Sequence, residues 1–201
     1  MQFKKLIKFL VIGSILILVF SFFYQKEKIL INDNDKHNIE QFDVILSSGQ
    51  SFQSKLLNLF NISVQSYSHI GLILKENNKI YILHSTPDGT EDNGIRYDNF
   101  QEFIDLSNVN YYRILRLDSL GEYQNIEKSI KHFKETKIPF DYDFDNIDKH
   151  KIYCSELVFD IFNDNKLIKT KLDLSKPIHP KEFVKMTEFR TIKERKTTQQ
   201  W

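Results

Sequence analysis

The chain has 201 residues, of which 41% are hydrophobic and 27% are charged, and its formal net charge is +1. These proportions are ordinary for a folded globular protein, and the small number of glycines and prolines argues against a low-complexity or disordered chain. The near-neutral charge, without a broad basic stripe, gives no reason to expect a nucleic-acid partner.

The first segment, residues 1–24, has the pattern of an export signal or membrane anchor. Lys4, Lys5 and Lys8 precede an uncharged apolar run from Phe9 to Tyr24, which is a basic region followed by a hydrophobic one. No small-x-small cleavage pattern comes after the run, so the sequence favours an uncleaved single-pass transmembrane helix over a removed signal. The lysines at the start favour an exported domain, which would lie in the periplasm or envelope if the signal were cleaved. The alternative is a buried core helix.

The rest of the chain divides by composition into three parts. Residues 25–40 are polar, with Asn-Asp-Asn-Asp at 32–35, and predict a linker. The folded domain is expected over residues 41–190, and the charged stretch 191–201 is expected to be a loose tail.

Hydrophobic spacing predicts a mixture of strands and helices within that domain. Strands are expected at Phe42–Leu46 and Asn108–Leu117, and a hairpin at Ser68–Lys75 and Lys79–Ser85. Helices are expected at Phe52–Phe60, Glu122–Thr136 and Tyr153–Phe162, and from Pro180 to Met186, with an aromatic-rich loop at Pro139–Asp148. Because the elements show no βαβ rhythm, they predict an α+β fold with a largely antiparallel sheet packed against helices.

The hairpin carries two histidines. A tight turn at residues 76–78 pairs odd positions of the first strand with even positions of the second, which puts His69 and His84 on one face. Cross-strand neighbours of that kind are roughly 5–8 Å apart at Cβ, and a register shift of one residue would separate them. Two imidazoles there could act as a base and its orienting partner, or bind a metal, or simply pack within the sheet.

Cys154 is the only cysteine of the chain. Exported proteins that use cysteine structurally use it in pairs, so Cys154 is either a core residue or a reactive thiol. It lies at the first turn of a predicted helix, where unpaired N–H groups and the helix dipole favour a thiolate. Against this, Cys154 shares one helical face with Leu157, Val158 and Ile161, as a small core residue would.

Four segments in order resemble a known family. They are Phe42-Asp-Val-Ile-Leu, Tyr67-Ser-His-Ile-Gly-Leu-Ile-Leu, Tyr81-Ile-Leu-His, and Phe140-Asp-Tyr-Asp-Phe-Asp leading to Tyr153-Cys-Ser-Glu-Leu-Val. Together they resemble the YiiX/YaeF-like permuted papain-fold amidases of the NlpC-type superfamily, which also holds lecithin–retinol acyltransferase-like enzymes.

The resemblance implies a circularly permuted papain-like fold and a site that needs neither metal nor cofactor. It implies that Cys154 is the nucleophile, His69 its base and His84 the residue that orients His69. The YiiX-like members would carry Glu at the third position, so His84 is closer to the acyltransferase-like branch. Tyr142, Asp143 and Tyr153 are candidates to line the site, or are loop residues that only pack and form turns. His179, which together with Pro180 resembles a late segment of the family, is taken as structural or as part of the rim.

The leading hypothesis is a membrane-anchored cell-envelope cysteine amidase or peptidase that acts through a thioester on substrates such as peptidoglycan peptides. One alternative is an acyltransferase or lipid esterase of the same fold. Others are a non-catalytic envelope binding module, which the combination of Cys154, His69 and His84 disfavours, and a His-His-Cys zinc site, which has the right ligand types but no recognised spacing.

Overall fold

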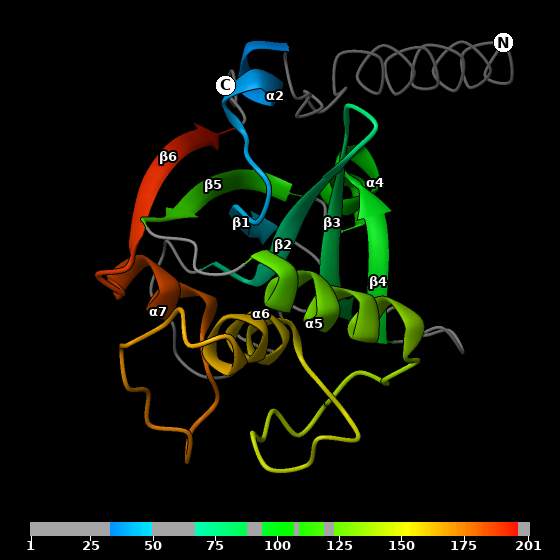
Figure 1. Ribbon diagram of the computed structural model, residues 1–201, viewed down its shortest axis with the longest axis vertical. Helices are drawn as coiled ribbons and strands as arrows, with labels where there is room; N and C mark the ends of the chain where they lie inside the picture. Colours follow the sequence, from blue (N-terminus) through cyan, green and yellow to red (C-terminus); the bar gives the residue numbers. More distant parts are fainter. Residues whose placement is uncertain (1–32, 50–66, 88–93, 107–108, 119–122, 197–201) are drawn as a thin grey trace, which may run out of the picture. The chain divides into compact units, whose positions relative to one another are not determined.

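The fold is built on one six-stranded antiparallel sheet (Figure 1). The computed structural model describes residues 33–49, 67–87, 94–106, 109–118 and 123–196. The strands lie in the order β4-β3-β2-β1-β5-β6, and each pair of neighbours is antiparallel. Their bounds are Val44–Gly49 (β1), His69–Glu76 (β2), Lys79–Thr86 (β3), Gly94–Asn99 (β4), Val109–Leu117 (β5) and Phe189–Lys196 (β6). The predicted α+β class with an antiparallel sheet is confirmed.

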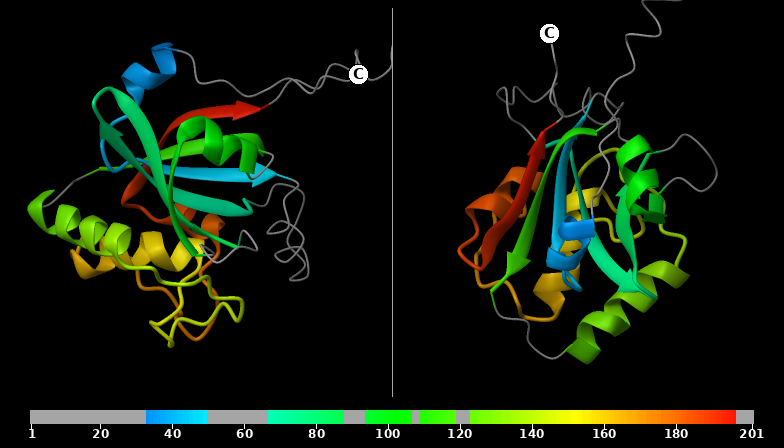
Figure 2. Two further views of the ribbon diagram at one scale, coloured as in Figure 1. Left: turned by 90° about the vertical axis from the view of Figure 1, so that its right-hand side faces the viewer. Right: turned by 90° about the horizontal axis from the view of Figure 1, so that it is seen from above.

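Helices cover both faces of this sheet. Their bounds are Asp33–Asn38 (α2), Phe100–Leu106 (α4), Tyr123–Glu135 (α5), Cys154–Asp164 (α6) and Pro180–Lys185 (α7). Figure 2 shows α5 and α6 next to each other on one side of the sheet and α4 on the other.

The alternation of side chains along the strands produces a separate core on each face. Even-numbered residues of β2, such as Ile70 and Leu72, belong to the core that contains Leu157 and Val158 of α6. The odd-numbered Ile73 belongs to the other core, with Phe100 and Phe103 of α4. The residue-by-residue pattern of β2 therefore decides which helix each of its side chains meets.

The hairpin β2–β3 has the predicted register. Asn77 and Asn78 form its turn with φ angles of 50° and 62°, the left-handed conformations that a type I′ hairpin turn requires and that Asn tolerates. Ladder pairing runs from Glu76 and Lys79 to Leu72 and Leu83 and is not continued beyond them. Because β2 extends back to His69 and β3 forward to Thr86, the two strands separate at this end.

Several elements differ from the sequence prediction. Strand β1 begins at Val44 rather than Phe42, because Phe42 is in a turn with a φ of 68°. Strand β4 and helix α4 were not predicted. The signal for α4 was a capping box: Asn99 Oδ1 accepts the N–H of Glu102 at 3.0 Å, and Glu102 Oε2 accepts the N–H of Asn99 at 2.8 Å.

The expected linker and tail also contain structure. Helix α2 lies within residues 25–40, and the predicted loose tail is wrong as far as Lys196, because β6 pairs with β5 there. The pattern was missed because β6 is an edge strand whose polar side chains outnumber its apolar ones. The helix predicted at Phe52–Phe60 and the segment 1–24 lie outside the described residues. Among the helices that are described, none has the length and apolarity needed to span a membrane.

Gly71 is a point where β2 and β3 leave no room for a side chain. A Cβ at this position would lie 2.4 Å from Ile82 Cγ2 and 3.2 Å from His84 Cβ. We expect Gly71→Ala to lower the free energy of unfolding by about 1–3 kcal/mol, because overpacking displaces both neighbours. Urea denaturation measures the change.

The matched control is the same substitution in an Ile82→Ala background, which lacks the Cγ2 atom. There Gly71→Ala should cost markedly less, as a double-mutant cycle would show. Equal costs in both backgrounds would mean that the contact with Ile82 is not the source of the loss.

Candidate active site

The N-terminus of α6 enters the region where β2 and β3 separate. Ile73 N–H donates to the carbonyl of Asp43 at 2.7 Å on the β1 side, and N–H groups alternate in direction along a strand. The N–H of Ile70 therefore points away from β1, toward β3, and it is directed at the sulfur of Cys154. On the other strand, Ser85 Oγ donates to the carbonyl of Ile152 at 2.6 Å. These contacts hold the start of α6 between the two strands.

Two histidines and one aspartate form a buried hydrogen-bonded chain across the same separation. His69 Nε2 lies 2.8 Å from His84 Nδ1, and His84 Nε2 lies 3.1 Å from Asp98 Oδ2 on β4. Both histidines have no exposed surface. Their rings pack on Phe103 of α4, with centroid separations of 5.3 and 5.1 Å. The predicted same-face histidine pair is confirmed.

The charge of Asp98 determines which ring nitrogens carry protons. Burial raises the pKa of this carboxyl group, but hydrogen bonds from His84 and Arg96 outweigh it, and the net pKa is below the ordinary value. Arg96 Nε is 3.0 Å from Asp98 Oδ2. A carboxylate only accepts hydrogen bonds, so His84 carries its proton on Nε2 and leaves Nδ1 as an acceptor.

This arrangement determines the tautomer of the second ring as well. His69 must donate from Nε2 to His84 Nδ1, which leaves Nδ1 of His69 with a free lone pair. That Nδ1 is buried and has no hydrogen-bond partner in the described part of the chain. Burial, and secondarily His84, hold the pKa of His69 well below its usual value, although Asp98 opposes them. His69 is therefore a neutral imidazole whose Nδ1 is free to accept a proton.

Cys154 is a neutral thiol, contrary to the expectation drawn from its position on a helix. Burial raises its pKa to about 11, although Ser155 and nearby backbone N–H groups, including that of Ile70, act in the opposite direction. The helix N-terminus does not compensate for the loss of water around a buried sulfur. The thiol lies beside Ile70, one residue from His69, and in the described structure it makes no hydrogen bond to the His69 ring.

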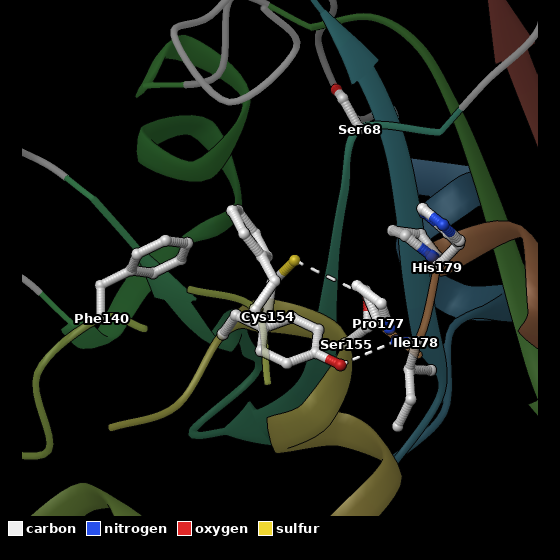
Figure 3. Close-up of a pocket in the computed structure, with 10 residues that line it drawn as sticks. Ser68, Phe140, Cys154, Ser155, Pro177, Ile178 and His179 are labelled. Atoms are coloured by element: carbon white, nitrogen blue, oxygen red, sulfur yellow. Dashed lines mark hydrogen bonds between the residues drawn. The ribbon is translucent and has the colours of Figure 1, made fainter. Parts of the chain in front are cut away.

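A pocket opens beside the sulfur (Figure 3). Its lining is mostly aromatic and apolar: Ser68, Phe140, Phe144, Tyr153, Cys154, Ser155, Pro177, Ile178, His179 and Pro180. Of the three residues expected to line the site, only Tyr153 does so. Tyr142 is half exposed, and Asp143 points to an ion pair with Lys151 at 2.9 Å.

Sequence reasoning missed Asp98 and underestimated His179. Asp98 belongs to a strand that was not predicted, although the capping box that starts at the next residue indicated where that strand ends. His179 was placed at the rim, yet it lines the pocket together with Cys154. The pair His179-Pro180 resembles a late segment of the family, but nothing in this pair indicates that the His179 ring lines the pocket.

Comparison with known proteins identifies the family of this chain. The family model described as "Permuted papain-like amidase enzyme, YaeF/YiiX, C92 family" matches residues 38–199. The chain belongs to this family. No curated protein matches it.

A solved structure shows the same fold. It is described as the crystal structure of metalloprotein yiiX from Escherichia coli O157:H7. The two chains share 16% identity with a TM-score of 0.60, over 79% of this chain and 98% of the other. The predicted permuted papain-like fold is confirmed.

The raised pKa of the thiol predicts slow alkylation of the folded protein at neutral pH. Iodoacetamide reacts with the thiolate, so the labelling rate of native Cys154 should keep rising toward about pH 11. In the unfolded chain the rate should level off above about pH 8.5. Mass spectrometry monitors the single cysteine directly. A native rate that is already at its plateau at neutral pH would instead indicate a preformed thiolate.

Proposed function

We propose that this permuted papain-like amidase is a cysteine amidase or peptidase of the cell envelope, with Cys154 as nucleophile and His69 as general base. The observation that carries the proposal is the free lone pair on the buried Nδ1 of His69. His69 is the residue directly before Ile70, whose backbone N–H is directed at the thiol of Cys154. A nucleophile, a base and an orienting chain are the parts that acyl transfer requires.

The two neutral groups define how the reaction would start. Because the thiol pKa is raised and the His69 pKa is lowered, the proton moves from sulfur to Nδ1 as the sulfur attacks the substrate carbonyl. The imidazolium so formed donates from Nε2 to His84, and Asp98 stabilises its charge through that ring. His69 then gives its proton to the leaving amine, and a thioester remains on Cys154. Water, activated by the same nitrogen, releases the acyl group.

The pocket indicates what kind of acyl group would fit. No Lys, Arg, Asp or Glu side chain is among its lining residues in the described structure. Phe140, Phe144 and Ile178 offer apolar contact instead, which favours an uncharged, hydrophobic acyl portion. This observation supports the second candidate, an esterase or acyltransferase acting on lipids. Peptidoglycan peptides are the substrates that the first candidate, the amidase or peptidase, would cleave.

The envelope location rests on the sequence alone. The basic residues and apolar run of residues 1–24 support a membrane anchor with the domain exported. Such an anchor would keep the pocket near both lipids and cell-wall peptides.

The word metalloprotein in the yiiX description raises the question of a metal here. Among the described residues, no three or more His, Cys, Asp and Glu side chains are grouped so that they could hold a metal ion. The facing nitrogens of His69 and His84 hydrogen-bond to each other and are therefore not free to bind a metal. These residues do not fit a metal site, and the proposed steps use none.

The proposal predicts a covalent acyl-enzyme on Cys154. The full chain should be incubated separately with peptidoglycan fragments, an N-acyl amide and a phospholipid, and intact-mass spectrometry should detect an acyl adduct. Cys154→Ala should abolish the adduct, and His69→Gln should slow its formation by at least about 1,000-fold, because the base is lost.

The matched control is His150→Gln, which removes a histidine four residues before the nucleophile but outside the hydrogen-bonded chain and the pocket. It should react like the wild type. Turnover that persists in Cys154→Ala would exclude the thioester mechanism. An adduct formed only from the phospholipid would favour the lipid esterase or acyltransferase over the peptidase.

A further inference from the structure

His179 lines the pocket beside Cys154, and none of the hydrogen bonds within the described residues involves its Nδ1. It precedes α7 with φ −85° and ψ 142°, and its side chain makes no capping hydrogen bond to that helix. Its Nδ1 is buried and has no hydrogen-bond partner in the part of the chain that the structure describes. A buried polar nitrogen without a partner costs free energy, so its position calls for a ligand that satisfies it.

The segment that carries His179 is fixed to the nucleophile. The N–H of Ile178 donates to the hydroxyl of Tyr153 at 2.7 Å (Figure 3). That hydroxyl in turn donates to Asn146 Oδ1 at 2.6 Å. Because Tyr153 directly precedes Cys154, one buried phenol determines the distance between the segment of His179 and the start of α6. The backbone that carries His179 is therefore fixed relative to Cys154, and both residues line the same pocket.

The imidazole of His179 is also suited to donate a hydrogen bond while it is neutral. Burial lowers the pKa of His179, with Lys181 and Lys185 acting in the same direction and Glu182 against them. A neutral imidazole offers one N–H donor and one acceptor. Ser68 and Ser155 are the other residues with polar side chains, besides Tyr153 and Cys154, that line this pocket.

We infer that His179 binds substrate by donating a hydrogen bond from Nδ1 to the carbonyl oxygen that Cys154 attacks. The inference rests on the proposed role of Cys154. It separates two tasks: His69 takes and returns the proton, whereas His179 holds the carbonyl oxygen from the pocket side. As the carbonyl carbon becomes tetrahedral, its oxygen gains negative charge and this hydrogen bond strengthens. His179 itself gains and loses no proton in the reaction.

Two substitutions of similar polarity test the position of the donor. In His179→Asn the amide nitrogen can take the place of Nδ1, whereas in His179→Gln it reaches the place of Nε2. With p-nitrophenyl butyrate as the probe and the full chain as the enzyme, the nitrophenol burst reports acylation of Cys154. We expect His179→Asn to keep the burst rate within about threefold and His179→Gln to lose at least about tenfold, toward the 100-fold typical of a lost oxyanion donor.

Two further measurements separate binding from structure. The iodoacetamide rate of Cys154 and the thermal midpoint should match the wild type in both variants, because neither the base nor the core is altered. Should either variant fail to fold, His179→Ala with added imidazole replaces it, and restoration of the burst supports the inference.

Each outcome decides between the two proposals. Equal burst rates in His179→Asn and His179→Gln, or no rescue by imidazole, overturn the role of Nδ1. A burst that survives in Cys154→Ala overturns the proposed nucleophile instead, since the probe is then acylating another group.

Discussion

The site depends on the separation of β2 and β3 beyond the pair Leu72 and Leu83. A ladder that continued to His69 would use the N–H of Ile70 in pairing and leave no space for the first turn of α6. Because the ladder ends, that N–H is directed at Cys154 instead, and the polar side chains of His69 and His84 connect the strands where the backbones do not. Gly71 keeps the two strands close enough for this contact.

Burial explains both the stability of the polar chain and its reactivity. Water would compete for every hydrogen bond between His69, His84 and Asp98, but the ring of Phe103 excludes it from the two imidazoles. The same exclusion keeps Cys154 and His69 uncharged at rest. The anion of Asp98 is separated from the base, His69, by the single ring of His84. It can therefore stabilise the positive charge that appears on His69 only while substrate is bound. Position 84 carries a histidine where a carboxylate was expected. The carboxylate is supplied instead by Asp98 on β4, which accepts a hydrogen bond from His84.

Features that depend on short-range pattern were predicted well from the sequence. Alternation and the Asn77-Asn78 turn determine the register of the hairpin, and the register places both histidines on one face. The start of the helix that carries Cys154 was likewise predicted to within one residue. Asp98 could not be found in this way, because its strand is half polar and its role appears only when β4 pairs with β3. The raised pKa of the thiol was missed because a helix terminus can be recognised in a sequence, whereas burial is a property of the assembled fold.

The protonation state of His69 can be measured directly by ¹⁵N NMR of the histidine rings at neutral pH in the full chain. His69 and His84 should both be neutral and protonated on Nε2, so that His69 Nδ1 shows the chemical shift of an unprotonated nitrogen. In Asp98→Asn the amide carbonyl should turn to Arg96 and the NH₂ group to His84, which reverses both tautomers and protonates His69 Nδ1. A His69 ring that is charged, or protonated on Nδ1 in the wild type, would show that His69 is not a neutral base with a free Nδ1.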